Sequence, residues 1–525
     1  MAYIDISSSA EMMPDQNQVS SFLKRYQQAE TVKDHWKDKF EEAYEYCLPQ
    51  RESFYDETPG ERRTDKIFDE TAVVGVQEFA SRLQAGIVPT FARWADFQAG
   101  SEIPEDQRNS VNEQLDSITN YVFEILQNSN FNQEIHESFM DLAIGTGVLL
   151  VEEGNAINPI KFSAIPLPRV SLLSGPDNRI DTVFRTRYVE ASEIKILYPK
   201  AKLPENFDVV SMNNNNKKFK VIEGIYKLYD KPNKERHKRC VVIDELKAMI
   251  LEEYYDGEGS NPFLVFRWNK ASGEVYGRGP VFNAISAIKT CNLTIELILE
   301  NAQMNISGVY TFEDDGVINP ENISLVPGSL IPVAPGSRGL QPISGAGNFD
   351  VAQLVLNDMR ANIKKALYME TLGRPEGTPM TATEVSERMA DLSRQIGSSF
   401  GRLQSELIYP LLRRIIRILS KQGRIDIPKI NGREVKVVAR SPLAKAQHLQ
   451  DVADVNRFNQ IIAGTFGPQM INLIINQNET ARYIAEKMNL PEKLIRDESE
   501  QQALAEQVKQ MQQAPQASGN DNGMG

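Results

Sequence analysis

The stretch VFNAISAIKTCNLTIELILENAQMNI, from Val281 to Ile306, decides how this chain is organised. Its apolar residues recur at alternating intervals of three and four, which predicts one long helix with a narrow stripe suited to packing on a neighbouring helix. The stripe consists of Ile285, Ile288, Asn292, Ile295 and Leu299.

The residues that follow supply such a neighbour. Several prolines and glycines over 307–348 predict short strands and turns, and helical spacing returns over 350–371. A helix, a compact insertion and a second helix together have the layout of a stalk with a small tip.

A loop then leads to a third long helix. The loop is longer than a connection between helices requires, so it is either a plain connector or a mobile segment whose movement the prolines limit. Its glycines and prolines are Gly373, Pro375, Gly377 and Pro379. The third helix is predicted from about Thr383 to Gln422, with a kink at Pro410 because proline has no N–H and crowds the preceding turn.

The rest of the chain mixes helices and strands. Three earlier helices are predicted over 20–47, 68–88 and 109–143. Strand-like runs begin at Gly145 and are densest between 219 and 269. Short helices are expected over 442–512, and the Gln-, Asn- and Gly-rich end over 514–525 is expected to be disordered. The predicted fold class is therefore α+β and mainly helical.

Composition excludes several classes of protein. At 525 residues the chain has the length of roughly three to four domains. Its 58 basic and 71 acidic residues give a formal net charge of −13, whereas a dedicated nucleic-acid binder needs a basic surplus to displace phosphate counterions. No uninterrupted apolar run approaches ~18 residues, so the sequence predicts no membrane protein.

Cysteines, histidines and motifs narrow the chemistry further. The three cysteines are far apart and odd in number, which implies a reducing compartment and no disulfide framework, and the amino terminus lacks the features of a secretion signal. The four histidines have no zinc-like spacing, and no Walker-type, HExxH or GxSxG motif occurs. We therefore predict no enzyme, no cofactor, no metal and no catalytic residue.

Basic residues are the candidate functional residues. A helix-spaced group consists of Arg413, Arg414, Arg417, Lys421 and Arg424. This group is either a solvated face or a surface for acidic groups of another subunit or for DNA. In the helix over 350–371, Arg360, Lys364 and Lys365 are only solubilising in a monomer, but repeated around a ring they form a belt of charge. A further basic run over 231–239 is interpreted as a solvated hairpin tip, with contact to a phosphate or a partner as the alternative.

Several stretches resemble one family in sequence and in order. They are Phe79–Pro89 (FASRLQAGIVP) with Trp94, Tyr276–Pro280 (YGRGP), Asn301–Ala302, Gly308–Tyr310 (GVY), Asp314–Val317 (DDGV), Pro327–Gly328, Ile331–Val333 (IPV), Met380–Val385 (MTATEV) and Glu406–Arg414 (ELIYPLLRR). In this order, over roughly residues 20 to 470, the chain resembles the podovirus head-to-tail connecting protein family, the portal proteins of T7-like tailed bacteriophages.

The resemblance implies a portal-type subunit that assembles as a dodecameric ring at one capsid vertex, where DNA is packaged and later ejected. The implied parts are a wing over 1–275 (its 145–270 portion β-rich), stem helices over 276–306 and 349–372, a clip over 307–348, a channel (tunnel) loop over 373–383, a long kinked wing helix over 384–424 and a crown over 425–513. The implied partners are viral double-stranded DNA, a packaging motor (terminase), tail adaptor proteins, and capsid and scaffolding proteins, with no membrane. The implied location is the virion, after assembly in the host cytoplasm.

Two hypotheses about residues combine the resemblance with the basic groups. Arg360, Lys364, Lys365 and the loop residue Arg374 are expected near the channel, where they would touch phosphates weakly without reading bases. The group from Arg413 to Arg424 is expected to pair with acidic groups of the adjacent subunit, because a closed ring needs complementary surfaces on opposite sides of each copy.

Two other functions stay open at the level of sequence. One is another virion structural protein such as a tail adaptor, although long helices around a compact insertion favour a portal. The other is a metal-dependent nucleic-acid enzyme, for which 71 acidic residues supply material. The acidic balance itself predicts a protein that surrounds DNA without gripping it, since B-DNA carries a negative charge about every 1.7 Å and a strongly basic tunnel would trap it.

Overall fold

The computed structural model describes residues 16–55, 64–99, 105–204, 207, 218–230, 235–307, 310–311, 335–336, 341–342, 349–369, 397–426, 435–439, 442–466 and 475–488. The chain forms two compact units, one of Met1–Met380 with Gln395–Ala439 and one of Thr381–Arg394 with Arg440–Gly525. It is 54% helical and 21% strand, which confirms the prediction of a mainly helical mixed fold.

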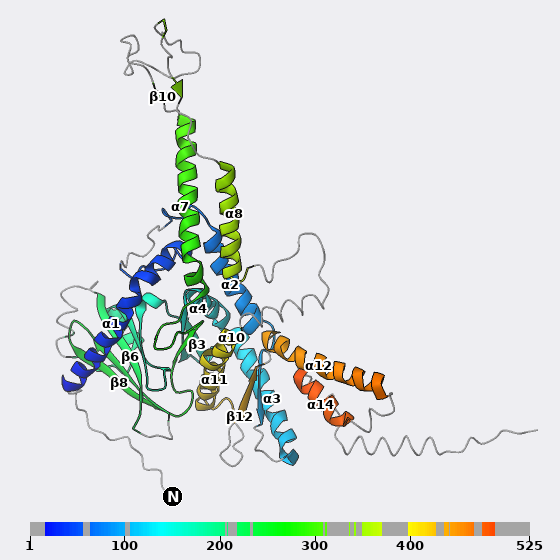
Figure 1. Ribbon diagram of the computed structural model, residues 1–525. Coiled ribbons are helices and arrows are strands. Elements are labelled where there is room, and N and C mark those ends of the chain that lie inside the picture. Colours follow the sequence, from blue (N-terminus) through cyan, green and yellow to red (C-terminus); the bar gives the residue numbers. More distant parts are fainter. Residues whose placement is uncertain are drawn as a thin grey trace, which may run out of the picture. The chain divides into compact units, whose positions relative to one another are not determined.

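Helices dominate the beginning of the first unit (Figure 1). They are α1 (Gln16–Cys47), α2 (Thr71–Ile87), α3 (Glu105–Asn128) and α4 (Phe131–Ile144). The single helix predicted over 109–143 is wrong, because the chain breaks at Ser129 and Asn130 into two helices. The side chain of Asn130 bonds the backbone N–H and carbonyl of Phe162 (3.1 and 2.8 Å), and this competes with helical hydrogen bonding.

Two antiparallel sheets follow. The three-stranded sheet has the order β3-β2-β9, and the five-stranded sheet runs β4-β5-β6-β7-β8. The strands are β2 (Thr146–Glu153), β3 (Ile160–Ala164), β4 (Val170–Ser174), β5 (Ile180–Glu190), β6 (Lys218–Leu228), β7 (Arg236–Ile243), β8 (Ala248–Asp256) and β9 (Phe263–Arg267). The strands predicted after Gly145 and over 219–269 are confirmed. Part of the basic run over 231–239, interpreted as a hairpin tip, lies in β7 instead.

The five-stranded sheet has apolar residues on both faces. Helix α1 covers one face, where the rings of Phe22 and Tyr26 meet Phe184 with centroids 5.4 and 5.6 Å apart. The opposite face packs against the short helix α5 (Ala191–Leu197). Because successive side chains of a strand point to opposite faces, one sheet supports both clusters.

A small sheet joins distant parts of the first unit. Strand β1 (Ala95–Ala99) pairs with β12 (Val435–Ala439), with Phe97 opposite Val437 in antiparallel register. Neither strand is predicted from sequence, since each is short and its partner lies more than three hundred positions away.

The predicted helix pair is confirmed. Helices α7 (Pro280–Ser307) and α8 (Phe349–Ala366) lie side by side (Figure 1), and the short strands β10 (Tyr310–Thr311) and β11 (Gln341–Pro342) pair between them in sequence. Helix α8 ends before the predicted 371, because Tyr368 takes a left-handed φ of 58°. The N–H groups of Tyr368 and Met369 then bond the carbonyls of Lys365 (3.1 Å) and Lys364 (2.8 Å), which closes the helix end.

The predicted third helix is described from Gly397 onward. It consists of α10 (Gly397–Leu403), the π-helical turn η4 (Gln404–Ile408) and α11 (Tyr409–Lys421). The kink expected at Pro410 takes the form of this π turn, in which the N–H of Tyr409 bonds the carbonyl of Gln404. Proline has no N–H to continue the α-helical pattern, so the irregular turn lies directly before it.

The second unit contains the helices α12 (Pro442–Phe466) and α14 (Gln477–Met488), which pack on each other. They confirm the expectation of helices in this part of the chain. The tail expected to be disordered, 514–525, lies outside the described residues.

Candidate functional site

One buried polar junction attaches the α7–α8 pair to α2. The side-chain oxygen of Asn292, in α7, accepts from the backbone N–H groups of Phe68 (2.7 Å) and Asp69 (2.9 Å). The carboxylate of Asp69 in turn accepts from Arg360 of α8 (2.7 Å) and from the N–H of Thr71 (2.9 Å). Asn292 and Asp69 are 3% and 4% exposed, so these two members of the junction are buried.

Electrostatics favour the charged form of this junction. Burial by itself raises the pKa of Asp69, but hydrogen bonds from Thr71 and Arg360 outweigh that effect and the net pKa is lowered. The pKa of Arg360 is raised, first by its hydrogen bond to Asp69. The junction therefore holds an ion pair at neutral pH and fixes α7, α8 and the start of α2 to one another.

The residues predicted near a channel have different surroundings. Arg360 is committed to its own chain, although its side chain stays 40% exposed. Lys364 and Lys365 are exposed in the last turn of α8. The other candidates lie outside the described residues: Gly373, Arg374, Pro375, Gly377 and Pro379. A role of this group near DNA stays a prediction.

The end of α8 is held by an aromatic cluster and a cation. The ring of Tyr368 lies against those of Trp268 and Phe79, with centroids 5.8 and 6.4 Å apart. Arg82 of α2 donates to the carbonyls of Tyr368 (3.0 Å) and Met369. The chain is thus held firmly at Met369, three residues after the end of α8, where this described stretch stops.

The start of α10 is held by the same segment of the chain. Ser399 donates to the side-chain oxygen of Asn269 (2.9 Å), and Arg402 donates to the carbonyl of Trp268 (3.2 Å). The preceding residue, Arg267, is 2% exposed and forms an ion pair with Glu406 in the π turn at 2.5 Å. Residues 267–269 therefore anchor both described ends of the segment that includes the predicted channel loop.

The basic group of α11 also has partners within its own chain. Arg414, predicted at a subunit interface, is only 7% exposed. It donates to the carbonyls of Val151 (3.1 Å), Gly259 (3.3 Å) and Ser260 (3.1 Å). Burial lowers its pKa to about 10. The expected apolar side of the helix is confirmed by four buried residues: Leu411, Ile415, Ile418 and Leu419.

Two neighbours of Arg414 hold the same loop after β8. Arg413 forms an ion pair with Glu258 at 3.6 Å, and Arg417 donates to the carbonyls of Asp256 and Glu258. The loop is therefore fastened to α11 by side chains from successive turns.

The end of α11 fastens the β2–β3 hairpin in a similar way. Lys421 bonds Glu153 at 2.6 Å, and Arg424 donates to the carbonyl of Ala156 at 2.5 Å. The basic group thus clamps α11 to two loops of its own chain. Whether its exposed members also pair with another subunit stays a prediction.

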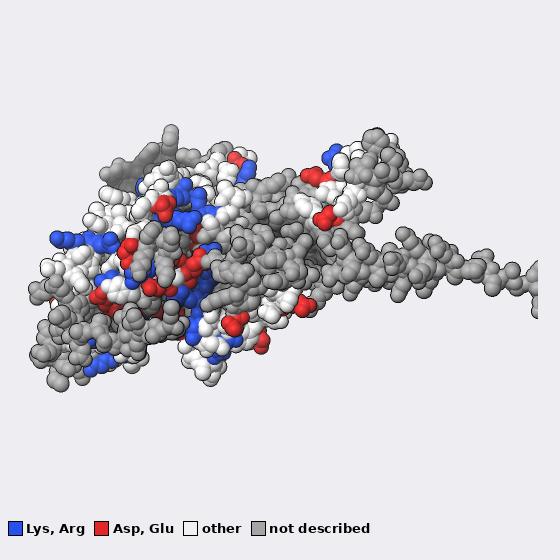
Figure 2. All heavy atoms as spheres, turned by 90° about the horizontal axis from the view of Figure 1, so that it is seen from below, with Lys and Arg blue, Asp and Glu red and all other residues white. Residues whose placement is uncertain are grey.

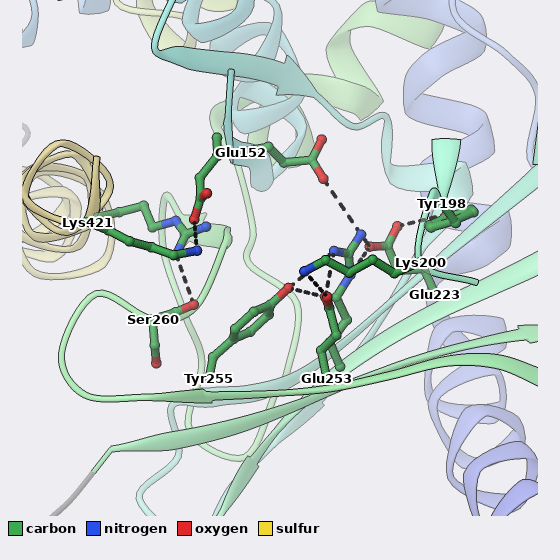
Figure 3. A network of polar contacts seen from close by, with 11 residues as sticks. Glu152, Tyr198, Lys200, Glu223, Glu253, Tyr255, Ser260 and Lys421 are labelled. Carbon is green, nitrogen blue, oxygen red and sulfur yellow. Dashed lines mark hydrogen bonds and ion pairs between the residues drawn. The ribbon is translucent and has the colours of Figure 1, made fainter. Parts of the chain in front are cut away.

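Further polar contacts lie between the two sheets, where the carboxylates of Glu152, Glu223 and Glu253 come together (Figure 3). The guanidinium of Arg239 lies among these carboxylates, 3.7 Å from Glu152, 2.5 Å from Glu223 and 3.5 Å from Glu253. Burial lowers the pKa of Arg239, but Glu223 and Tyr255 outweigh it and the pKa is raised. These contacts join β7 and β8 of one sheet to β2 of the other.

The described part of the chain offers no candidate metal site, and the cavity between α1 and β5 is small. Within the described ranges, no group of three or more His, Cys, Asp or Glu side chains is placed to hold a metal ion. A polar cavity of about 140 Å³ lies between α1, β5 and the 3₁₀ turn at Leu167–Arg169. Ligand sites commonly have roughly 300–1,000 Å³. On the face in Figure 2, cations and carboxylates are interspersed over the coloured residues, with no broad patch of one sign.

Helix α7 leaves apolar surface uncovered. Leu293, Leu297 and Leu299 are 54%, 55% and 52% exposed. By length and composition alone, Pro280–Gln303 passes the test for a membrane-crossing helix, and it is the one such helix among the described residues. The core helix of a soluble protein passes the same test. A helix of this kind needs a further surface to cover it.

Sequence reasoning missed the residues that anchor the helices. Asp69, Arg82 and Trp268 gave no signal because their partners are distant in sequence. Asn292 stood in the predicted apolar stripe, and a polar residue at such a position was the one available sign of a buried hydrogen bond.

The chain is similar over most of its length to known bacteriophage proteins. A family described as "Bacteriophage head to tail connecting protein" matches residues 19–495. A probable portal protein of Bordetella phage BPP-1 is 23% identical over 474 residues, covering 85% of this chain and 83% of its own length. The portal protein of Escherichia phage T7 is 20% identical over 462 residues, with 86% and 82% covered. That of Enterobacteria phage T3 is 19% identical over 394 residues, with 73% and 71% covered.

Solved structures with some likeness come from gene transfer agent particles. A chain from the virion of the native particle is 12% identical, with a TM-score of 0.34, and the match covers 81% of this chain and 90% of that one. A chain from the neck of the native particle is 12% identical, with a TM-score of 0.33, and the match covers 79% and 91%.

Proposed function

This chain belongs to the bacteriophage head to tail connecting protein family, and from that premise we propose that its copies close into a ring through which DNA passes. The chain is a portal-type connector, a structural component of the virion at the head-to-tail connection. In the proposal the ring has twelve copies, as the family resemblance implies.

The uncovered apolar surface of α7 carries the ring proposal. Three leucines of this helix are more than half exposed in a single copy. Apolar surface of this kind is stabilised when another protein surface removes it from water, and in a homo-oligomer that surface is a further copy.

We assign parts of the ring to segments of the chain. Helices α7 and α8 form the stem, with the clip over 307–348 and the channel loop over 373–383. The firm attachment of residues 368 and 399 to the segment 267–269 supports the loop assignment, since a loop that meets moving DNA needs a rigid base. The residues before 275 form the wing and those after 425 the crown.

Lys364 and Lys365 are the described residues proposed to meet phosphates, together with Arg374 of the loop. They act as weak, sequence-independent contacts. Arg360 contributes through the part of its side chain that the ion pair with Asp69 leaves exposed.

Partners follow from the same premise. A packaging motor (terminase) and later tail adaptor proteins dock at the clip, and capsid and scaffolding proteins surround the wing. Assembly takes place in the host cytoplasm.

We retain an inter-subunit role for the exposed members of the α11 group. The side chains of Arg413 and Lys421 are 50% and 66% exposed, so they have surface left for an acidic neighbour. Changing Arg413→Glu and Arg417→Glu together should abolish rings, and intact rings would contradict this role. Arg414 is left out of this proposal, since it is 7% exposed and bonds carbonyls of its own chain.

Imaging the purified protein tests the proposal as a whole. Negative-stain electron microscopy is expected to show rings with a central hole, and mass photometry is expected to give a mass near twelve times 59.1 kDa. A species that stays monomeric at all concentrations, together with virions that assemble without this protein, would refute it. Replacing Lys364 and Lys365 with alanine should spare the ring and reduce DNA retention.

A further inference from the structure

Helix α7 has two apolar sides. Its buried residues, among them Ile288 and Cys291, share a side with Asn292, whose side chain bonds the backbone just before α2, and the helix packs there on α1, α4 and α8. At about 100° per residue, Leu293 and Leu297 lie on the opposite side, one turn apart. They are 54% and 55% exposed, so they form an open pair with a shallow gap between them.

Helix α8 also has an apolar residue on its outer side. Its buried positions Leu356, Ile363 and Leu367 face the rest of the unit. Leu354 lies roughly opposite them on the helix and is 72% exposed. The two-helix pair therefore carries uncovered leucines on two different sides, which is the arrangement of a head-to-tail contact between copies rather than of a two-fold contact.

The heights of these leucines along the pair can be compared through the buried junction. Arg360 of α8 and Asn292 of α7 both bond Asp69, at 2.7 and 2.9 Å, so the tip of the Arg360 side chain lies near the level of residues 291–292 of α7. A helical side chain leans toward the N-terminus of its helix by about a turn, so Cys291 is level with a position near Asn357. Because the helices run in opposite directions, moving three positions along each makes Leu354 level with position 294.

Leu354 is thus level with the Leu293–Leu297 pair. It stands within about 1.5 Å of the height of Leu293 and within about 5 Å of that of Leu297, at ~1.5 Å per residue. In the proposed ring the helix pair runs along the ring axis, and rotation about that axis preserves height, so Leu354 of one copy is level with this pair on the next copy.

We infer that Leu354 of one copy packs between Leu293 and Leu297 of the adjacent copy, and that this contact repeats around the ring. The inference rests on the ring of the proposed function and adds the surface, the partner and the register. A side chain set between residues i and i+4 of a facing helix is the usual way in which helices interlock.

Cysteine cross-linking tests the register in the full-length chain. Leu293→Cys with Leu354→Cys is expected to give a ladder of linked multimers under mild oxidation, whereas each single variant stays unlinked. The native Cys47, Cys240 and Cys291 are buried, so the wild-type background is suitable. The matched control is Ser286→Cys with Leu354→Cys, because Ser286 is exposed on nearly the same side of α7 but about 10 Å lower than Leu293.

The outcomes separate this inference from the ring itself. Rings with at least about ten-fold more linkage in the 293/354 pair than in the control support the register. Rings with equal or no linkage overturn the register and leave the ring proposal standing. Absence of rings in the wild type overturns both.

A charged substitution at Leu354 provides a second, independent test of the contact. Leu354→Asp is expected to weaken self-association at least about ten-fold while the circular dichroism spectrum and melting of the single copy stay unchanged, because this residue is exposed there. Unchanged self-association would overturn the inference. So would wild-type protein that floats with phosphatidylcholine vesicles and does not self-associate, since lipid would then cover the face.

Discussion

Replacing Arg414 with methionine isolates the clamp between α11 and the loop after β8. The substitution Arg414→Met keeps most of the apolar volume and removes three hydrogen bonds, to the carbonyls of Val151, Gly259 and Ser260. The neighbouring Arg413→Met is the matched control, because that side chain is 50% exposed and has one ion pair at 3.6 Å.

Two opposing effects determine how much stability the Arg414→Met substitution removes. Hydrogen bonds from a charged donor contribute about 1.5–3 kcal/mol each, or roughly 5–9 kcal/mol for three. Against this, burial lowers the pKa of Arg414 from its ordinary value to about 10, which costs on the order of 3 kcal/mol of stability for the charged form, at ~1.4 kcal/mol for each pKa unit. The loss of the hydrogen bonds is the larger of the two effects. After allowance for water that reaches the loop carbonyls, Arg414→Met should reduce the stability of the closed loop by about 3 kcal/mol.

Hydrogen exchange measures this locally. The N–H of Val151 bonds Pro262 (2.8 Å) and that of Gly257 bonds Glu235 (2.7 Å), so both report the closed loop. In Arg414→Met their exchange should accelerate about 100-fold, the equivalent of about 3 kcal/mol. In Arg413→Met it should change less than about three-fold, as expected for an exposed ion pair. Equal effects of the two substitutions would refute the assignment of the clamp to Arg414.

Three further predictions concern other parts of the first unit. The pKa of His237 is lowered to about 4, first by burial, so stability should fall as pH drops from about 6.5 to 4; His237→Gln should flatten this dependence in urea titrations at a series of pH values. Asp69→Asn and Arg360→Met should show a coupling of about 1–2 kcal/mol in a double-mutant cycle of unfolding, and strict additivity would rule out the buried ion pair as a stabilising contact. Gly75→Ala should lower the melting temperature, since a Cβ there lies 2.5 Å from a leucine at the end of α8, whereas Gly401→Ala, with open space around it, should raise it slightly.

The helix pair could be predicted from sequence because its signal is local. Alternating spacing from Val281 to Ile306 marks α7 without knowledge of any partner, and a proline-rich insertion separates it from α8. The end of α8 could not be predicted, since Tyr368 takes a conformation for which glycine is the usual sign, and its contacts with Trp268, Phe79 and Arg82 are distant in sequence.

The candidate site was less accessible to sequence reasoning. A run of arginines on one helix looks the same whether it faces solvent, another subunit or carbonyls of its own chain. Arg414 has backbone oxygens as partners, and backbone oxygens leave no trace in a sequence. The pairing of β1 with β12 was hidden for a similar reason, as neither five-residue strand has a neighbour in sequence to pair with.

The π turn between α10 and α11 constrains how this part of the chain can change length during evolution. A turn of this kind holds one residue more than an α-helix of the same length, so a single inserted codon creates it and a single deleted codon removes it. Deletion would rotate α10 by about 100° relative to α11. Ser399 and Arg402 would then leave Asn269 and Trp268, and one end of the segment over 370–396 would lose its attachment. Lineages that keep this attachment should therefore preserve the number of residues from 397 to 410 even where the residues themselves change.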